Sequence, residues 1–226
     1  MKIVMLGNSV GLRIRPPSEY PNNKTYTQIL RDEGHVTINL CKGRSLLQDI
    51  TNNMDLILRE CPDYYILNIG VTDLSSREIP LWYSDILHSK RSGIVRKINI
   101  LIYEKFLKKI RRILVILRFK RSWVSEREYK DNLKYLIKRI KKETNAKIFI
   151  MPILSVTSRI EKELPGSKSR FEKINLWYES LNDNRVKVLT GIVREAGVVN
   201  PDGIHLNAEG HKEVASLILN EMGDWM

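Results

Sequence analysis

Short hydrophobic runs alternate with longer amphipathic segments along most of the chain. Five runs have strand length and are rich in β-branched or aromatic residues: Lys2–Leu6, Val36–Leu40, Tyr64–Ile69, Lys147–Ile153 and Val186–Leu189. Helical spacing predicts helices over Thr25–Asp32, Ser45–Arg59, Ser125–Lys142, Ser169–Leu181 and Ala208–Met222. This alternation predicts a three-layer α/β/α arrangement around a mostly parallel, five-stranded sheet. The 226 residues fit one domain that spans residues 1–226.

Residues 90–122 do not fit this alternation and are predicted to form a helical insertion. The apolar positions Ile98, Ile102, Phe106, Ile110, Ile113 and Leu117 recur there at helical spacing. Twelve Lys and Arg residues and one acid, Glu104, lie between positions 90 and 121, so this segment carries +11 of the net charge of +12. We therefore expect a basic amphipathic helix.

The sequence does not determine what the apolar stripe of that helix contacts. Its apolar stripe could pack on the core, mediate self-association, or lie on an anionic membrane surface or against a lipid-linked substrate. Nucleic acid is disfavoured because the rest of the chain is nearly neutral and few aromatic residues stand among the cations.

The cysteines and the lengths of the apolar runs indicate the cellular compartment. Cys41 and Cys61 have neither the number nor the spacing of a disulfide framework or a metal site. The apolar run after Met1 is too short for a signal peptide, and no run reaches the roughly 18 apolar residues that a membrane-spanning helix needs. We expect a cytoplasmic protein that can associate peripherally with a membrane.

Candidate catalytic residues follow the predicted strands, where the functional loops of a parallel sheet gather. Ser9 follows the first strand, and Asp202 and His205 precede the last helix. A serine hydroxyl becomes a good nucleophile when a histidine takes its proton and a carboxylate orients that histidine. Ser9, His205 and Asp202 are candidates for these roles. The backbone amides of Ser9 and Gly43 could stabilise the oxyanion.

Four blocks of the chain resemble those of the SGNH or GDSL hydrolases, in the same order. They read Gly7-Asn8-Ser9, Gly43, Gly70-Val71-Thr72-Asp73 and Asp202-Gly203-Ile204-His205. The resemblance implies the SGNH-hydrolase, flavodoxin-like fold and a serine esterase with a Ser-His-Asp triad and an acyl-enzyme. Such an esterase needs no cofactor, and we expect no metal site.

Two positions depart from the family pattern. Asn8 replaces the usual Asp of the first block, a near-isosteric change that can keep local hydrogen bonds. Thr72 stands where the family has an Asn side-chain donor, so its hydroxyl is either a weaker oxyanion donor or a filler. Asp73 is expected to brace its loop rather than to touch substrate.

The stretch from Gly70 to Arg77 also resembles a variant found in SGNH proteins of bacterial polysaccharide loci. That likeness implies an O-acyl group on a carbohydrate or a lipid-linked glycan, with Arg77 available to an anionic group. Two alternatives stay open: an O-acyltransferase that uses the same triad, and a catalytically decayed protein that binds glycans or membranes through its insertion.

Overall fold

A parallel β-sheet forms the centre of the molecule. In the computed structural model, residues 1–12, 14, 22–89, 93–190 and 203–225 are described. The strands are β1 (Lys2–Gly7), β2 (Val36–Asn39), β3 (Tyr64–Asn68), β4 (Lys147–Ile150) and β5 (Val186–Val188). They pair in the order β2-β1-β3-β4-β5, and every pairing is parallel. The predicted fold class is confirmed.

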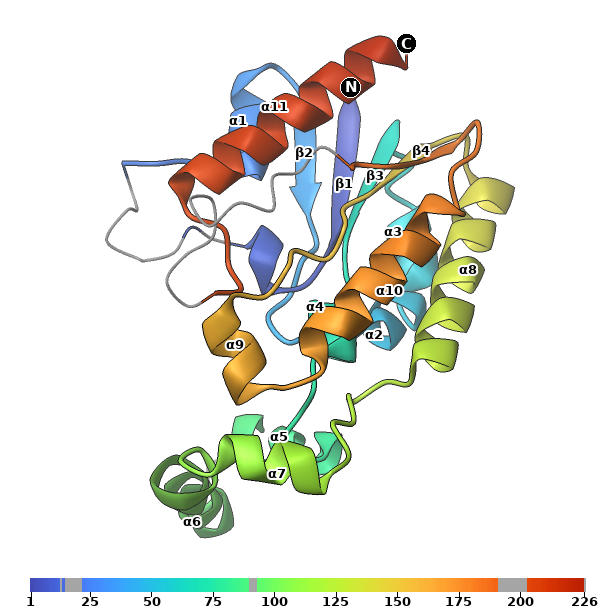
Figure 1. The fold of residues 1–226 in the computed structure, drawn as a ribbon. Coiled ribbons are helices and arrows are strands. Elements are labelled where there is room, and N and C mark those ends of the chain that lie inside the picture. The colour runs from blue at the N-terminus through green and yellow to red at the C-terminus, as the bar shows by residue number, and fades with distance from the viewer. Residues whose placement is uncertain (13, 15–21, 90–92, 191–202, 226) are drawn as a thin grey trace.

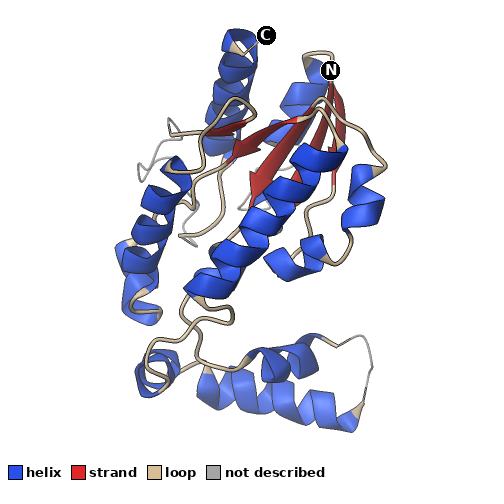
Figure 2. Ribbon diagram, turned by 90° about the vertical axis from the view of Figure 1, so that its right-hand side faces the viewer, coloured by secondary structure: helices blue, strands red, loops and turns tan. Residues whose placement is uncertain are grey.

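Helices cover both faces of this sheet, as Figures 1 and 2 show. One face carries α1 (Tyr26–Asp32) and α11 (Ala208–Asp224), and the other carries α2 (Leu47–Thr51), α3 (Met54–Leu58), α8 (Glu126–Glu143) and α10 (Ser167–Glu179). Successive residues of a strand point to opposite faces. In β1, Val4 and Leu6 pack toward the α8 side, whereas Ile3 and Met5 pack toward the α11 side.

Side-chain caps fix several helix starts close to the predicted positions. Thr25 forms a capping box with Gln28 at the start of α1, and the Ser125 hydroxyl accepts from the Glu128 amide at the start of α8. The helix predicted over Ser45–Arg59 is instead two short helices. Asn53, with φ −111° and ψ 17°, leaves the helical region between α2 and α3.

Four short elements escaped sequence prediction because each is about two turns long or less. They are a 3-10 turn at Ser9–Gly11 and the helices α4 (Val71–Leu74), α5 (Leu81–His88) and α9 (Ser158–Glu163). All four contribute residues to the candidate site described below. Short helices give a weak periodic signal in sequence.

The basic segment forms two helices rather than the single one expected from its stripe. Helix α6 (Ile94–Ile102) runs into a π-helical turn at Tyr103–Leu107, and α7 (Arg111–Leu117) follows after a break. We refer to these three elements as the insertion helices. Ile110 leaves helical geometry with φ −102° and ψ 18°, and the next residue, Arg111, turns toward buried Glu78. Figure 1 places these helices at the end of the molecule opposite both termini.

The insertion helices do not bury the stripe that defines them in the sequence. Ile98, Ile102, Phe106, Ile110, Ile113 and Leu117 are all exposed, and Val115 is the buried residue among the described residues of these elements. Packing of the stripe on the core is therefore not observed. No helix in the described ranges is both long and apolar enough to cross a bilayer.

Candidate active site

Ser9 lies directly after the carboxyl end of β1, on the 3-10 turn Ser9–Gly11. The buried Asn8 side chain accepts from the Val10 amide at 3.2 Å and caps this turn. As the first residue of the turn, Ser9 has a backbone amide without an intrahelical acceptor. Asn8 does not line the cavity beside Ser9; it holds the turn that presents the serine.

Close packing of two strands explains the glycine two residues before Ser9. The Asn8 amide donates to the Asn68 carbonyl at 3.1 Å, which brings the ends of β1 and β3 together. A Cβ atom on Gly7 would lie 2.0 Å from the Asn68 carbonyl oxygen. A side chain at this position would therefore push the nucleophile loop away from β3.

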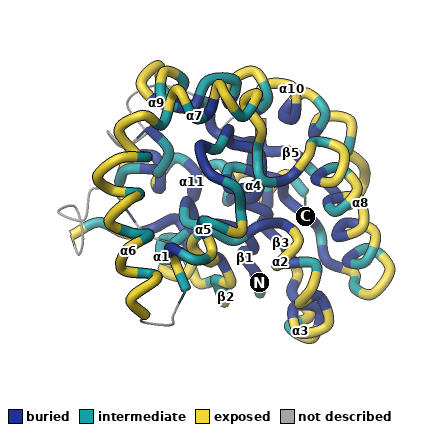
Figure 3. The backbone as a smooth tube through the Cα atoms, turned by 90° about the horizontal axis from the view of Figure 1, so that it is seen from below, coloured by how far each residue is buried: buried dark blue, intermediate teal, exposed yellow. Residues whose placement is uncertain are grey.

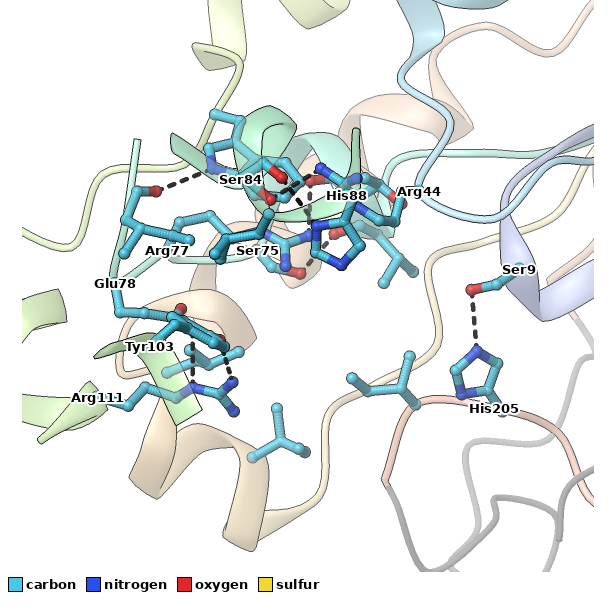
Figure 4. A pocket seen from close by; sticks show the side chains of 18 residues that line it. Ser9, Arg44, Ser75, Arg77, Glu78, Ser84, His88, Tyr103, Arg111 and His205 are labelled. Carbon is cyan, nitrogen blue, oxygen red and sulfur yellow. Dashed lines mark hydrogen bonds and ion pairs between the residues drawn. The ribbon is translucent and has the colours of Figure 1, made fainter. Parts of the chain in front are cut away.

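His205 comes from the other end of the chain and meets Ser9. Its Nε2 atom lies 2.9 Å from the Ser9 hydroxyl oxygen (Figure 4). Gly203, two residues earlier, has φ 74°, and a Cβ there would lie 2.3 Å from the Thr157 hydroxyl oxygen. The loop thus reaches Ser9 by passing tightly over the start of α9. Asp202, the expected orienting carboxylate, lies outside the described residues.

Thr72 and Gly43, two further site residues predicted from sequence, differ in their position relative to the cavity. Thr72 is buried in α4 and lines the cavity. Gly43 is exposed and is not a lining residue, although the neighbouring Lys42 amide donates to the Gly7 carbonyl at 3.0 Å. The left-handed backbone conformation in that loop belongs to Arg44, with φ 63°, rather than to Gly43.

Asp73 braces the loops beneath the site and does not line the cavity. Its carboxylate accepts from the Leu47 amide at 2.8 Å, and its carbonyl accepts from the Val124 amide at 3.1 Å. Asp73 is 1% exposed, and this burial raises the pKa of its carboxyl to about 6 despite the amide hydrogen bond. Asp73 thereby connects α4 to α2 and to the segment that follows the insertion helices.

A cavity of about 280 Å³ opens beside the Ser9–His205 pair. Its lining includes residues of the body, such as Thr72 and Ile204, and residues of α5 and the insertion helices, such as Leu87 and Tyr103. Figure 4 shows the Ser9–His205 pair on one side of the space and the arginine-rich wall across from it. The insertion therefore completes the wall of the cavity.

Two arginines share one aromatic ring in that wall. The guanidinium of Arg77 lies 4.0 Å from the ring centre of Trp123, and that of Arg44 lies 5.7 Å from it. Arg77 also donates to the Thr72 carbonyl at 2.9 Å, and Arg44 donates to the Ser84 hydroxyl at 2.8 Å. Burial lowers the pKa of Arg77 to about 10, so it remains cationic at neutral pH. This wall is electropositive.

A buried cluster of polar side chains attaches the insertion helices to the body. Glu78 accepts from the Tyr103 hydroxyl at 2.6 Å and from Arg111 Nε at 3.0 Å, and Arg111 also pairs with Glu163 of α9 at 3.1 Å. Burial alone would raise the pKa of Glu78, but Arg111 and the tyrosine hydroxyl outweigh it and lower that pKa. The cluster joins the insertion, α9 and the loop after α4.

Sequence patterns did not assign Arg44, Trp123 or the Glu78 cluster to the site. Arg44 was visible as a residue of a loop after a strand, where site residues gather. Glu78 lies in an irregular segment before the insertion, and Trp123 lies in one after it. Neither belongs to a motif, so the sequence offers no signal for them.

Comparison with protein families shows to which family the chain belongs. A model of the family described as GDSL-like lipase/acylhydrolase matches residues 43–218, more than half of the chain. The chain belongs to this family. Membership makes it a serine esterase, as the sequence resemblance predicted. A search of the curated proteins found no significant match.

Solved structures share the fold at low sequence identity. A lipase/acylhydrolase from Enterococcus faecalis is 15% identical with a TM-score of 0.62, and the match covers 98% of this chain and 94% of that one. An acetylxylan esterase from Geobacillus stearothermophilus is 16% identical with a TM-score of 0.56 over 100% and 95% of the two chains. A psychrotrophic esterase from Pseudoalteromonas is 13% identical with a TM-score of 0.53 over 99% and 97%. These matches include the Ser9 strand, which precedes the region matched by the family.

Proposed function

We propose that this esterase hydrolyses an O-acyl ester carried by a carbohydrate or a lipid-linked glycan, with Ser9 as the nucleophile and His205 as the general base. The observation that carries this proposal is the 2.9 Å contact between His205 Nε2 and the Ser9 hydroxyl at the edge of the 280 Å³ cavity. Nucleophile and base at hydrogen-bond distance beside a cavity are the geometric requirement for acyl transfer to serine.

The acylation step follows from that contact. Ser9 Oγ attacks the ester carbonyl carbon while its proton passes to His205 Nε2. The tetrahedral intermediate collapses, the bond from the carbonyl carbon to the alcohol oxygen breaks, and His205 returns the proton to that oxygen. The acyl group is then bound to Ser9 as an ester.

Deacylation repeats the same chemical steps with water as the nucleophile. His205 takes a proton from water as its oxygen attacks the acyl carbon, and the acid leaves as Ser9 Oγ recovers a proton from His205. Asp202 orients the imidazole ring in this proposal. The Ser9 and Gly43 amides, with the Thr72 hydroxyl, are the oxyanion donors that we propose.

The cavity wall supports a polar, negatively charged substrate. Trp123 offers an apolar ring of the kind that packs against a sugar, and Arg44 and Arg77 bring two positive charges to the same ring. Arginine binds carboxylate and phosphate groups through paired donors. One structural neighbour is an acetylxylan esterase, and that activity on an acylated carbohydrate agrees with the proposal. We propose that Arg77 binds an anionic group of the substrate.

Covalent labelling tests the nucleophile. A fluorophosphonate should add one adduct to the wild-type chain, seen by intact mass, and none to Ser9→Ala, because the activated hydroxyl is gone. His205→Ala should also lose both labelling and hydrolysis of a short-chain nitrophenyl ester. Ser84→Ala is the matched control, since Ser84 lines the same cavity and should leave labelling intact. An adduct on Ser9→Ala would disprove the assignment.

Substrate charge tests Arg77. Arg77→Met should lower kcat/KM for an acetyl ester of an acidic sugar by about tenfold, because one charge-assisted hydrogen bond is lost. Turnover of a neutral acetylated sugar should change by less than about twofold, since the serine and histidine are untouched. Equal losses of kcat/KM on the two substrates would show that Arg77 does not bind an anionic group of the substrate.

A further inference from the structure

The exposed hydrophobic side chains of this protein are concentrated on the insertion helices. Eleven of the 18 exposed large hydrophobic residues in the described ranges lie between positions 94 and 119. They are Ile94, Val95, Ile98, Leu101, Ile102, Phe106, Ile110, Ile113, Ile116, Leu117 and Phe119. We call these eleven side chains the insertion surface. Figure 3 views this end of the molecule and shows α6 with exposed and intermediate residues and none buried.

Scattered apolar residues on a protein surface need no explanation, but a concentration of this kind on one segment indicates a partner. The side of the insertion that faces the body is already used, because Tyr103 and Arg111 bind Glu78 and line the cavity. The insertion surface lies on and beside the same helices, and none of its side chains belongs to either hydrophobic core cluster in the described part of the chain.

Positive charge surrounds the insertion surface. Seven exposed cations lie on or next to the insertion helices: Lys97, Lys105, Lys108, Lys109, Arg112, Lys120 and Arg121. The acid of this segment, Glu104, pairs with Lys108 at 2.8 Å. The other six have no carboxylate partner among the described residues. A partner must therefore cover large apolar side chains and supply negative charge around them.

We propose that the insertion surface docks on the surface of an anionic phospholipid bilayer. Apolar side chains enter the boundary between headgroups and acyl chains, while the long Lys and Arg side chains extend to the anionic headgroups. A second copy of this chain would bring two strongly basic surfaces together, which like-charge repulsion opposes. Nucleic acid would meet the cations but would leave Phe106, Ile113 and their neighbours exposed to water.

The position of the insertion in the molecule suits this contact. Figure 1 shows it at one end of the molecule, with α11 and both termini at the other. A bilayer against α6 and α7 meets the end of the molecule whose residues also wall the cavity. Docking thus holds the cavity close to acyl esters that reside in or on a membrane.

Sedimentation with vesicles tests the proposal. The probes are vesicles of phosphatidylcholine alone and of phosphatidylcholine with a quarter phosphatidylglycerol. Wild type should partition at least tenfold more strongly onto the anionic vesicles, and this binding should fall as salt rises. Phe106→Ser with Ile113→Ser, and separately Lys105→Glu with Lys109→Glu, should each lower that partition at least tenfold.

Matched controls lie on the body of the protein. Leu56 and Leu176 are 61% and 68% exposed, close to the 65% of Phe106 and the 56% of Ile113, so Leu56→Ser with Leu176→Ser should change partition less than twofold. Lys138→Glu with Lys142→Glu changes the net charge as much as the insertion variant does and should retain most of the binding. All replaced residues are exposed, and circular dichroism verifies that the variants fold.

Three results would overturn the proposal: no binding of wild type to anionic vesicles at low salt, equal binding to neutral vesicles, or insertion variants that bind like their controls. Sedimentation equilibrium and titration with duplex DNA measure the other two partners. A dimer or a DNA complex that the insertion variants abolish, without vesicle binding by wild type, would assign the surface to that partner. The readout is binding, so it is independent of the proposed ester hydrolysis.

Discussion

Gly203 shows how a single atom controls the position of the proposed base. A Cβ at this residue would lie 2.3 Å from the Thr157 hydroxyl oxygen and 2.8 Å from Ile160 Cγ1, and its φ of 74° is unfavourable for other residues. We expect Gly203→Ala to lower kcat at least tenfold, because the loop must move and His205 moves with it.

The loss of stability in this variant should be about 1–2 kcal/mol, measured by urea unfolding. Gly93→Ala is the control, since no atom lies within 4 Å of its added Cβ and Gly93 has an extended backbone. Wild-type kcat in Gly203→Ala would show that the loop does not need this close contact.

Asp73 gives a pH-dependent prediction. Its pKa is 3.8 in an unfolded chain and about 6 in the fold, because burial disfavours its charged form. The folded state then binds more protons between these values, so the contribution of Asp73 to stability decreases as pH rises through this range. Asp73→Asn does not titrate there. Its free energy of unfolding relative to wild type should increase by about 2–3 kcal/mol between about pH 3.5 and pH 7.5.

Asp183→Asn controls for the sign of this effect. Burial opposes ionisation of Asp183, but hydrogen bonds from Lys141 and the Arg185 amide outweigh it and lower its pKa. The free energy of unfolding of Asp183→Asn relative to wild type should therefore decrease with rising pH. A pH-independent difference for Asp73→Asn would show that the carboxyl is not perturbed. Urea unfolding across the pH range measures both variants.

At the scale of secondary structure, the attachment of the insertion rests on Glu78. Its carboxylate binds Tyr103 and Arg111, which lie on the π-helical turn and on α7. Glu78→Gln removes a buried negative charge that Arg111 needs, so we expect a loss of about 1–3 kcal/mol in stability. Hydrogen exchange should accelerate over residues 94–117 more than in β3 and β4.

Glu104→Gln is the control for that variant. Glu104 forms an exposed pair with Lys108 on the same helical segment, and such pairs contribute little. We expect less than about 0.5 kcal/mol from its loss, with unchanged hydrogen exchange. Similar effects of the two substitutions would mean that burial of Glu78 does not matter to the attachment.

The sheet could be predicted from sequence because its central strands, β1, β3 and β4, are apolar on both faces. Ile3, Val4, Met5 and Leu6 are all buried, and the continuous run that they form is the sequence pattern of a parallel strand between two helical layers. The division of Ser45–Arg59 into α2 and α3 could not be predicted. The apolar spacing of that segment continues through the break at Asn53, which only the backbone reveals.

The site was predictable only in part. Ser9 and His205 belong to recognisable blocks, and the structure brings them together from opposite ends of the chain. Trp123 and Glu78 reach the cavity through the path of the insertion, which no local pattern encodes. The basic segment gave the correct amphipathic spacing but not its environment, because spacing shows that a stripe exists and not what covers it.

At the scale of the whole molecule, charge and chemistry occupy different regions. The basic segment carries +11 of the net +12, and its described part, residues 93–121, lies at one end of the molecule, whereas the nearly neutral α/β body supplies Ser9 and His205. The two regions meet at the cavity, which Tyr103 and Arg111 of the basic segment line together with Ser9 and His205. An esterase body and a basic attachment are thereby combined in one chain.

The insertion leaves and rejoins the body at neighbouring points. The Arg77 amide donates to the Arg121 carbonyl at 2.9 Å, and Arg170 of α10 donates to the carbonyls of Leu74 and Lys120 at 2.7 and 2.8 Å. The intervening residues thus form a closed excursion with a hydrogen-bonded base. The cost of closing such a loop depends only weakly on its length. Evolution can therefore lengthen, shorten or exchange this excursion, and with it the proposed docking surface, while the sheet and Ser9 keep their positions.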